Sequence, residues 1–464
     1  MSHLHDLSAT ELLAAYRGKT ISPVEVVRAV LRHIGAWEPH LHATYALDPE
    51  AAMAQAEASQ ARWLKGRPQG ALDGVPAMIK ENIATAGVAT PLGSAATELV
   101  PAPRDAPPSA RLREAGAVIL GKTSMPDYGM LSSGLSSFHG LTRNPWDLRK
   151  NPGGSSAGAG AGVAAGYGPL HVGTDIGGSV RLPAGWCGVF ALKPSLGRIP
   201  IDPPYAGRVA GPMTRSVADA ALMMGVLSQP DARDTMSLPW QDIAWARLER
   251  PIRGLRIGLL MDAGWGFAVE PEIKAAVDAA ARAFEAAGAI VLPVKPFMGR
   301  AMAEGMDDFW RCRSWLDLVA MSLERRARVL PFIRQWAEGG SGLSGERVFR
   351  GYSQMGAMRD AAVRACQPFD VLLSPTAPIP AYAAELPCPT NDPALPFEHI
   401  AFTLPFNMSE QPAASINCGF TAAGLPIGLQ IVGHRFDDLG VLQVARAWEQ
   451  MRPAQRAWPL QPPG

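Results

Sequence analysis

The stretch PGGSSAGAGAGVAAGYGPLHVGTDIGGSVR, residues 152–181, contains two glycine-rich loops that each hold a serine. Ser155 lies in the first loop and Ser179 in the second, and glycine at this density predicts tight turns that other residues avoid. Closer to the N-terminus, GVPAMIKEN (residues 74–82) places Lys80 after an apolar run. A buried lysine and two serines can carry out acyl transfer without histidine or metal, as a variant of serine-triad chemistry. The three segments together therefore predict acyl transfer.

Lys80 is the expected base of this chemistry. A serine hydroxyl is a weak nucleophile, and a lysine can activate it only when the amine is neutral. At the ordinary lysine pKa, roughly one side chain in 2,500 is neutral at pH 7. Burial lowers the pKa of a lysine, and the apolar residues 75–79 before Lys80 are consistent with burial. Glu81 follows directly, but neighbouring residues of a strand point to opposite faces, so its carboxylate is expected to face away.

The segment Gly177-Gly178-Ser179 is expected to bind a developing oxyanion. An oxyanion hole needs several backbone N–H groups directed at one point, and glycine allows the close approach that this requires. Arg181 follows and could anchor the loop electrostatically. A glycine turn without function is common by itself, as is a surface lysine after a strand, so the hypothesis depends on the three segments occurring together in this order.

The composition limits the classes of partner. The chain has 464 residues, 47% of them hydrophobic and 18% charged, with a formal net charge of +1. A large core can be buried, and no charge excess indicates nucleic acid or an acidic membrane surface. The stretches 152–174 and 411–434 are uncharged, but proline and polar residues interrupt both, so neither is expected to span a bilayer. Five widely spaced cysteines and no apolar leader predict free thiols and a cytoplasmic protein.

The pattern of apolar residues and turns predicts one continuous α/β domain over residues 1–464. A helical segment at 1–65 is expected to pack on it, since Ser8 and Ser22 each have a glutamate three residues later, the capping-box spacing. The catalytic motifs lie within 71–200. Strands are expected at 117–120, 255–260, 289–292, 371–376 and 425–433, and helices at 217–227, 271–287, 439–451 and over most of 301–365.

Three short patterns match known motifs without the structural context that those motifs need. Residues 116–123 (GAVILGKT) match the phosphate-binding P-loop formula, yet their apolar centre favours a strand over a flexible turn. Residues 160–165 match a relaxed form of the dinucleotide-binding fingerprint, and Ser156 occupies the nucleophile position of a G-x-S-x-G elbow. Both motifs need a preceding strand, and no strand is expected before either. None of the nine histidines forms an H-E-x-x-H motif, so no metal and no cofactor is expected. A nucleotide-binding module at 116–123 is the alternative of a different class.

The chain resembles the amidase signature family over about residues 8–450, most densely over 71–200. Both serine loops and the segment CGVFALKP (187–194) occur in the family's order. Towards the C-terminus, PFN (405–407) and GLPIGLQ (424–430) are also similar to the family's pattern. The resemblance implies an α/β fold in which one large mixed central β-sheet is flanked by helices on both faces.

The resemblance also implies roles for individual residues. Ser179 would be the nucleophile, Ser155 would follow a cis peptide bond and relay a proton, and Lys80 would act as base and then as acid. Backbone N–H groups would form the oxyanion hole, namely those of Ile176, Gly177, Gly178 and Ser179. Water would then hydrolyse the acyl-enzyme.

The resemblance implies an amidohydrolase that acts on linear C–N bonds of a small-molecule amide and releases a carboxylate with an amine or ammonia. The alternative is a glutaminase-type subunit of a tRNA-amidating complex, which the loop LPAGWC (182–187) does not resemble. No nucleic-acid or membrane partner is expected, and a homodimer is left open.

The sequence carries little information about the substrate. The region 265–336 is rich in aromatic residues, which raises the hypothesis of an apolar pocket for an aryl or alkyl amide, an anilide, an ester or a carbamate. Four residues of this region are instead interpreted as the core-facing stripe of a helix, because they recur at helical spacing: Phe309, Cys312, Leu316 and Val319.

Overall fold

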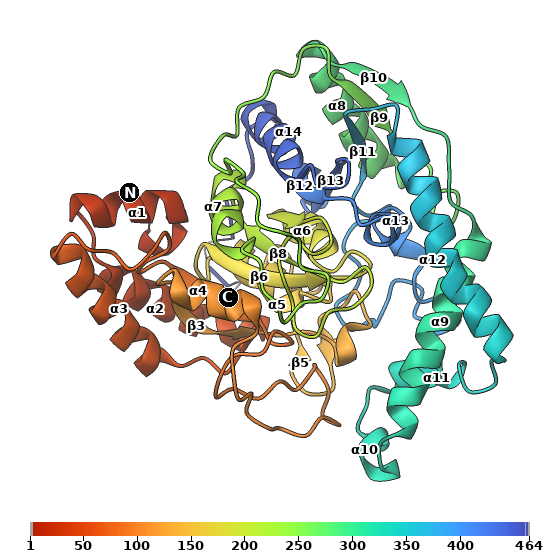
Figure 1. Cartoon of the computed structure of the whole chain (residues 1–464), viewed down its shortest axis with the longest axis horizontal. Coiled ribbons are helices and arrows are strands. Elements are labelled where there is room, and N and C mark those ends of the chain that lie inside the picture. Colours follow the sequence, from red (N-terminus) through yellow and green to blue (C-terminus); the bar gives the residue numbers. More distant parts are fainter. Residues whose placement is uncertain (1–2, 460, 463–464) are drawn as a thin grey trace.

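An 11-stranded mixed β-sheet forms the centre of the molecule (Figure 1). The structure is a computed structural model and describes residues 3–459, 461 and 462. The strands of this sheet are β1 (Thr44–Tyr45), β2 (Pro76–Lys80), β3 (Val118–Thr123), β6 (Leu170–Asp175), β7 (Phe190–Lys193), β8 (Val209–Thr214), β9 (Arg256–Leu259), β10 (Ile290–Pro293), β11 (Val371–Pro375), β12 (Ala413–Phe420) and β13 (Pro426–Val432). Their spatial order is β1-β3-β2-β6-β8-β7-β12-β13-β11-β9-β10.

The direction of the strands changes across the sheet. Strands β3, β2 and β6 are parallel to one another, as are β11, β9 and β10, whereas the pairs from β6 across to β11 are antiparallel. A separate hairpin pairs β4 (Leu135–Ser136) with β5 (Gly140–Leu141). The carboxyl ends of β2 and β6 therefore meet at the same edge, which places two of the sequence motifs side by side.

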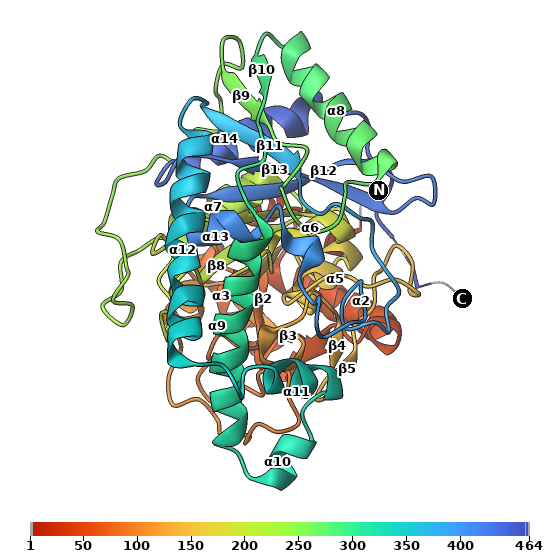
Figure 2. The same cartoon turned by 90° about the vertical axis from the view of Figure 1, so that its right-hand side faces the viewer.

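Helices flank the sheet on both faces (Figures 1 and 2). They are α1 (Ala9–Gly18), α2 (Pro23–Leu41), α3 (Pro49–Leu64), α4 (Pro107–Glu114), α5 (Ala157–Ala165), α6 (Arg181–Cys187), α7 (Val217–Leu227), α8 (Pro271–Ala286), α9 (Arg300–Val319), α10 (Leu323–Ala327), α11 (Pro331–Glu338), α12 (Gly345–Cys366), α13 (Leu404–Met408) and α14 (Asp438–Met451). In Figure 1, α1, α2 and α3 lie together beside β3, and α9, α11 and α12 form the opposite side. The expected α/β architecture is confirmed.

Local signals predicted the N-terminal helices correctly. Ser8 caps α1 with Glu11, and Ser22 caps α2 with Glu25, and in both cases the two reciprocal hydrogen bonds of a capping box are present. The expected strand at 117–120 is also confirmed and extends to Thr123 as the buried strand β3. Residues 116–123 therefore do not form a phosphate-binding loop.

The expected core stripe of α9 is wrong. Leu316 is 60% exposed and Val319 42% exposed, and Phe309 and Cys312 are only partly buried. The buried face of α9 consists instead of Met306, Trp310, Ser314 and Leu318. These residues recur every four positions, and one of them, Trp310, packs against Phe397 and lines the cavity beside Ser179.

Within the described part of the chain, none of the helices is both long enough and apolar enough to cross a bilayer. The five cysteines are all free thiols, as their spacing predicts.

Candidate active site

Lys80 and Ser155 meet inside the protein. Lys80 is the last residue of β2 and its side chain is fully buried. Its Nζ donates to the Ser155 Oγ at 2.8 Å and to the Thr174 Oγ1 at 3.0 Å. Thr174 lies near the end of the neighbouring strand β6, and Ser155 lies in the loop before α5, after a cis peptide bond to Gly154. The sheet thus brings together two of the residues that the sequence singled out.

Hydrogen bonds of Ser156 join the two serine loops. The Ser156 N–H donates to the Ser179 carbonyl at 3.1 Å. The Ser156 Oγ donates to the Thr174 carbonyl at 3.1 Å and accepts from the Thr174 N–H at 3.3 Å. Ser156 is therefore engaged in holding the backbone, which agrees with rejecting it as the nucleophile of a G-x-S-x-G elbow.

A buried ion pair anchors the loop that carries Ser179. The Arg181 Nε and Nη2 donate to the Asp175 carboxylate at 3.0 and 2.9 Å, and neither side chain is exposed. The same carboxylate accepts the N–H groups of Gly178 and Val180 at 2.8 and 3.1 Å. Burial by itself would raise the pKa of Asp175, but the Arg181 guanidinium holds that pKa well below its usual range. The sequence-based expectation for Arg181 is confirmed.

Two further residues complete this polar network, and both belong to C-terminal segments that resemble the family. The Asn407 Nδ2 donates to the Asp175 Oδ1 at 2.9 Å, and the Arg181 Nη1 donates to the Gln430 Oε1 at 2.8 Å. No local pattern connects these positions to the serine loops, since only the folded chain brings them together.

Gly178 has a conformation that only glycine adopts readily. Its φ is +131°, and a Cβ at this position would lie 2.5 Å from the Thr403 Oγ1. Its N–H already donates to Asp175, so one of the four N–H groups expected in the oxyanion hole is occupied in the structure. The N–H groups of Ile176, Gly177 and Ser179 make no hydrogen bond with the described residues.

The surroundings of Lys80 favour a neutral amine. Burial, and next the cation of Arg208, hold the pKa of Lys80 well below its usual value of 10.5, while Asp175 and Glu81 act in the opposite direction. The Glu81 carboxylate accepts the N–H groups of Leu92, at 3.1 Å, and Gly93, so it faces away from the amine as expected. The side chain of Lys80 therefore has the property that a general base needs.

Ser179 lines a cavity of about 40 Å³ whose other walls come from distant parts of the chain. Its apolar lining consists of Met130, Leu131, Ile176, Trp310, Phe397 and Ile400. Of the aromatic residues in 265–336, Trp310 is the one in this wall, and its ring packs edge-on against Phe397 at 5.4 Å between centroids. The sequence did not point to Phe397 or to Arg313, which also lines the cavity.

Known proteins resemble this chain over nearly its whole length. The family model Amidase matches residues 25–442. The chain belongs to the amidase signature family. The A subunit of the glutamyl-tRNA(Gln) amidotransferase of Myxococcus xanthus is 36% identical to it over 488 residues, which cover 96% of this chain and 97% of that protein. The family membership makes this protein an amide-hydrolysing enzyme.

Solved structures of the family have the same fold. A bacterial aryl acylamidase of the amidase signature family superposes with a TM-score of 0.89 at 30% identity, covering 97% of each chain. The peptide amidase of Stenotrophomonas maltophilia superposes with a TM-score of 0.82 at 29% identity, again over 97% of each chain. The central sheet with its flanking helices is therefore the fold of this family.

Proposed function

We propose that this enzyme hydrolyses a small-molecule amide through an acyl intermediate on Ser179. The observation that supports this most is the hydrogen bond of 2.8 Å between the buried Lys80 Nζ and the Ser155 Oγ, in a loop bonded to the backbone of Ser179. A neutral amine, a relay hydroxyl and a second hydroxyl facing a cavity are the parts that serine–lysine acyl transfer needs.

The reaction follows from these parts. The Ser179 Oγ attacks the amide carbon while its proton passes to Ser155 and the Ser155 proton passes to the Lys80 amine. The carbonyl oxygen, now negative, accepts hydrogen bonds from the N–H groups of Ile176, Gly177 and Ser179, with that of Gly178 shared with Asp175. The ammonium of Lys80 then returns the proton through Ser155 to the leaving nitrogen, and the C–N bond breaks. Water, activated along the same path, hydrolyses the ester of Ser179.

The lining of the cavity favours an amide with an apolar aryl or alkyl part. Trp310, Phe397 and Ile400 offer apolar surface beside Ser179, and such surface binds hydrocarbon by excluding water. Anilides, alkyl amides, esters and carbamates with such a group are the candidates.

The second candidate function is that of a glutaminase-type component in a tRNA-amidating complex. The observation that favours it is the 36% identity with a protein named as the A subunit of a glutamyl-tRNA(Gln) amidotransferase. The lining of the cavity argues against it, because the residues around Ser179 include no aspartate or glutamate that could pair with the ammonium group of glutamine.

Turnover of a panel by the purified chain separates the two functions. The panel contains 4-nitroacetanilide, benzamide, phenyl acetate and L-glutamine. We expect the anilide, amide or ester to be hydrolysed and Ser179→Ala to lose activity on the order of 10⁶-fold. Ser353→Ala, on the exposed side of α12, is the matched control and should retain turnover. A preference for glutamine, together with a stable protein partner on gel filtration, would favour the second function instead.

A further inference from the structure

The cavity beside Ser179 contains an arginine without a carboxylate partner. Arg313 extends from α9 into the lining, and its guanidinium lies 5.2 Å from the centre of the Tyr205 ring. Its Nη2 donates to the Met130 sulfur at 3.5 Å, and its Nε is buried without a partner among the residues that the structure describes. Among the described residues, no carboxylate lies within 4.0 Å of this cation.

Two more donors near this arginine are also poorly partnered. The hydroxyl of Tyr205 is buried and makes no hydrogen bond within the described part of the chain. Arg208, three residues further on, makes a single long hydrogen bond of 3.4 Å to the Pro203 carbonyl and no ion pair with a described residue. Burial and then the cation of Arg313 lower the pKa of Arg208.

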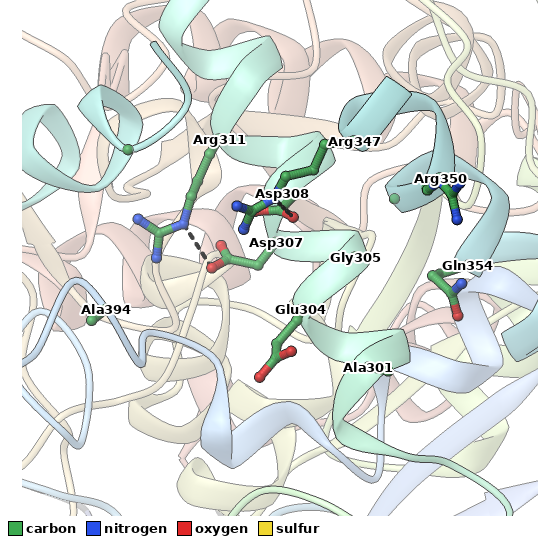
Figure 3. A pocket seen from close by; sticks show the side chains of 12 residues that line it. Ala301, Glu304, Gly305, Asp307, Asp308, Arg311, Arg347, Arg350, Gln354 and Ala394 are labelled. Carbon is green, nitrogen blue, oxygen red and sulfur yellow. Dashed lines mark hydrogen bonds and ion pairs between the residues drawn. The ribbon is translucent and has the colours of Figure 1, made fainter. Parts of the chain in front are cut away.

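Other arginines on and beside the same helix are satisfied by carboxylates. In the groove between α9 and α12, Arg311 pairs with Asp307 at 2.7 Å and Arg347 pairs with Asp308 at 2.7 Å (Figure 3). Arg313 is two residues from Arg311, yet it faces the cavity of Ser179 and has no such partner. A cation with a buried, unpartnered N–H group and no carboxylate nearby is unfavourable unless an anion from outside the chain binds it.

We propose that the substrate carries a carboxylate, bound by Arg313 with the Tyr205 hydroxyl as a further donor. This inference rests on the proposed function, since it describes the substrate of the same site. An arginine binds a carboxylate through two parallel N–H···O bonds, which fixes the orientation of the substrate as well as its affinity. The apolar part of the molecule lies against Trp310 and Phe397. Because the lining has no carboxylate, the substrate class is an amide with a carboxylate and without a nearby ammonium group.

Matched substrate pairs test this class. One pair is 4-acetamidobenzoate with its methyl ester, which places the charge on the amine side of the scissile bond. The other is adipamate with its methyl ester, which places the charge on the acyl side. We expect the wild type to prefer the anionic member of at least one pair in kcat/KM. In Arg313→Met the ratio of anionic to neutral kcat/KM should fall by about 10- to 100-fold, as expected for losing hydrogen bonds to a charged group. Arg313→Lys should give an intermediate ratio.

A control variant and a binding measurement keep this test separate from that of the proposed function. Arg350→Met removes an exposed arginine that pairs with Glu346 on α12, and should leave the ratio unchanged. The binding measurement uses Ser179→Ala, whose melting temperature should rise with 4-acetamidobenzoate or adipamate and should not rise once Arg313→Met is added.

The outcomes distinguish the two ideas. Hydrolysis that depends on Ser179 but has the same ratio in Arg313→Met overturns the carboxylate site and leaves the proposed function standing. A melting shift that is lost with Arg313, without turnover of any amide by the wild type, supports the carboxylate site and contradicts the proposed function. Absence of any melting shift, or a preference for L-glutamine over both anionic amides, overturns the inference.

Discussion

Replacing Lys80 by methionine should stabilise the folded protein by an amount that depends on pH. Burial and the cation of Arg208 lower the pKa of Lys80 in the folded state below 10.5, its value in an unfolded chain. Between these two pKa values the unfolded chain binds one proton more than the folded chain at this side chain. The free energy of unfolding of the wild type therefore increases with pH over that window, by about 1.4 kcal/mol per pH unit. Below the folded-state pKa, the free-energy cost of burying the protonated amine of Lys80 is constant, and above 10.5 this cost is absent.

The variant Lys80→Met has no such titration, and methionine fills a similar volume in the apolar surroundings. Its advantage over the wild type should thus be largest below the folded-state pKa of Lys80 and shrink by about 1.4 kcal/mol per pH unit as the pH rises from that pKa towards 10.5. Losing the hydrogen bonds to Ser155 and Thr174 changes the difference in the free energy of unfolding by the same amount at every pH. It does not change the slope of that difference with pH, because neither hydroxyl titrates in the range. The other ionisable groups contribute equally to the free energy of unfolding of both proteins, so their contributions cancel in the difference.

Urea unfolding followed by tryptophan fluorescence at pH 7, 8, 9 and 10 measures this difference. Lys274→Met, which removes an exposed lysine paired with Asp278, is the control for losing one charge. If the difference in the free energy of unfolding between Lys80→Met and the wild type stays constant across this range, Lys80 keeps its proton in the folded state and its pKa is not lowered.

Three further predictions follow from the geometry. Ser155→Ala should lower kcat by about 10⁴-fold or more with the fold retained, and a variant that kept most of its rate would exclude the relay. Gly178→Ala should lower the free energy of unfolding by about 1–3 kcal/mol, because φ of +131° strains any other residue; an unchanged melting temperature would contradict this. Arg208→Met removes a cation that lowers the pKa of Lys80, so the acid limb of kcat/KM for a neutral amide should move to higher pH, and a shift to lower pH would be inconsistent with that role.

Local sequence signals predicted those parts of the fold that depend on neighbouring residues. The capping boxes at Ser8 and Ser22 marked the starts of α1 and α2, and the apolar run before Gly121 identified β3. Strand β6 and helix α5 were not predicted, because every residue of both is buried and no alternation of apolar and polar residues marks them. Helix α5 consists of alanine, glycine and one valine, and its glycines offset the high helix propensity of its alanines.

In the candidate site, too, some residues could be predicted from local sequence signals and others could not. Lys80, Ser155 and Ser179 could be grouped because glycine-rich loops and a family resemblance marked them, and the structure brings Lys80 within hydrogen-bond distance of Ser155. The cavity walls could not be predicted, because Arg313 and Phe397 come from separate segments that meet only in the folded chain. The buried face of α9 was misjudged for the same reason, since Trp310 on that face is covered by Phe397 from a distant segment.

The most direct test of the account is mass spectrometry after reaction with an aryl-free alkyl fluorophosphonate, which phosphonylates activated serines. We predict a single adduct on Ser179, formed rapidly by the wild type and much more slowly by Lys80→Met. An adduct on Ser155 or Ser156, or labelling of Ser179 at an equal rate in both proteins, would contradict the claim that a buried neutral lysine activates this serine.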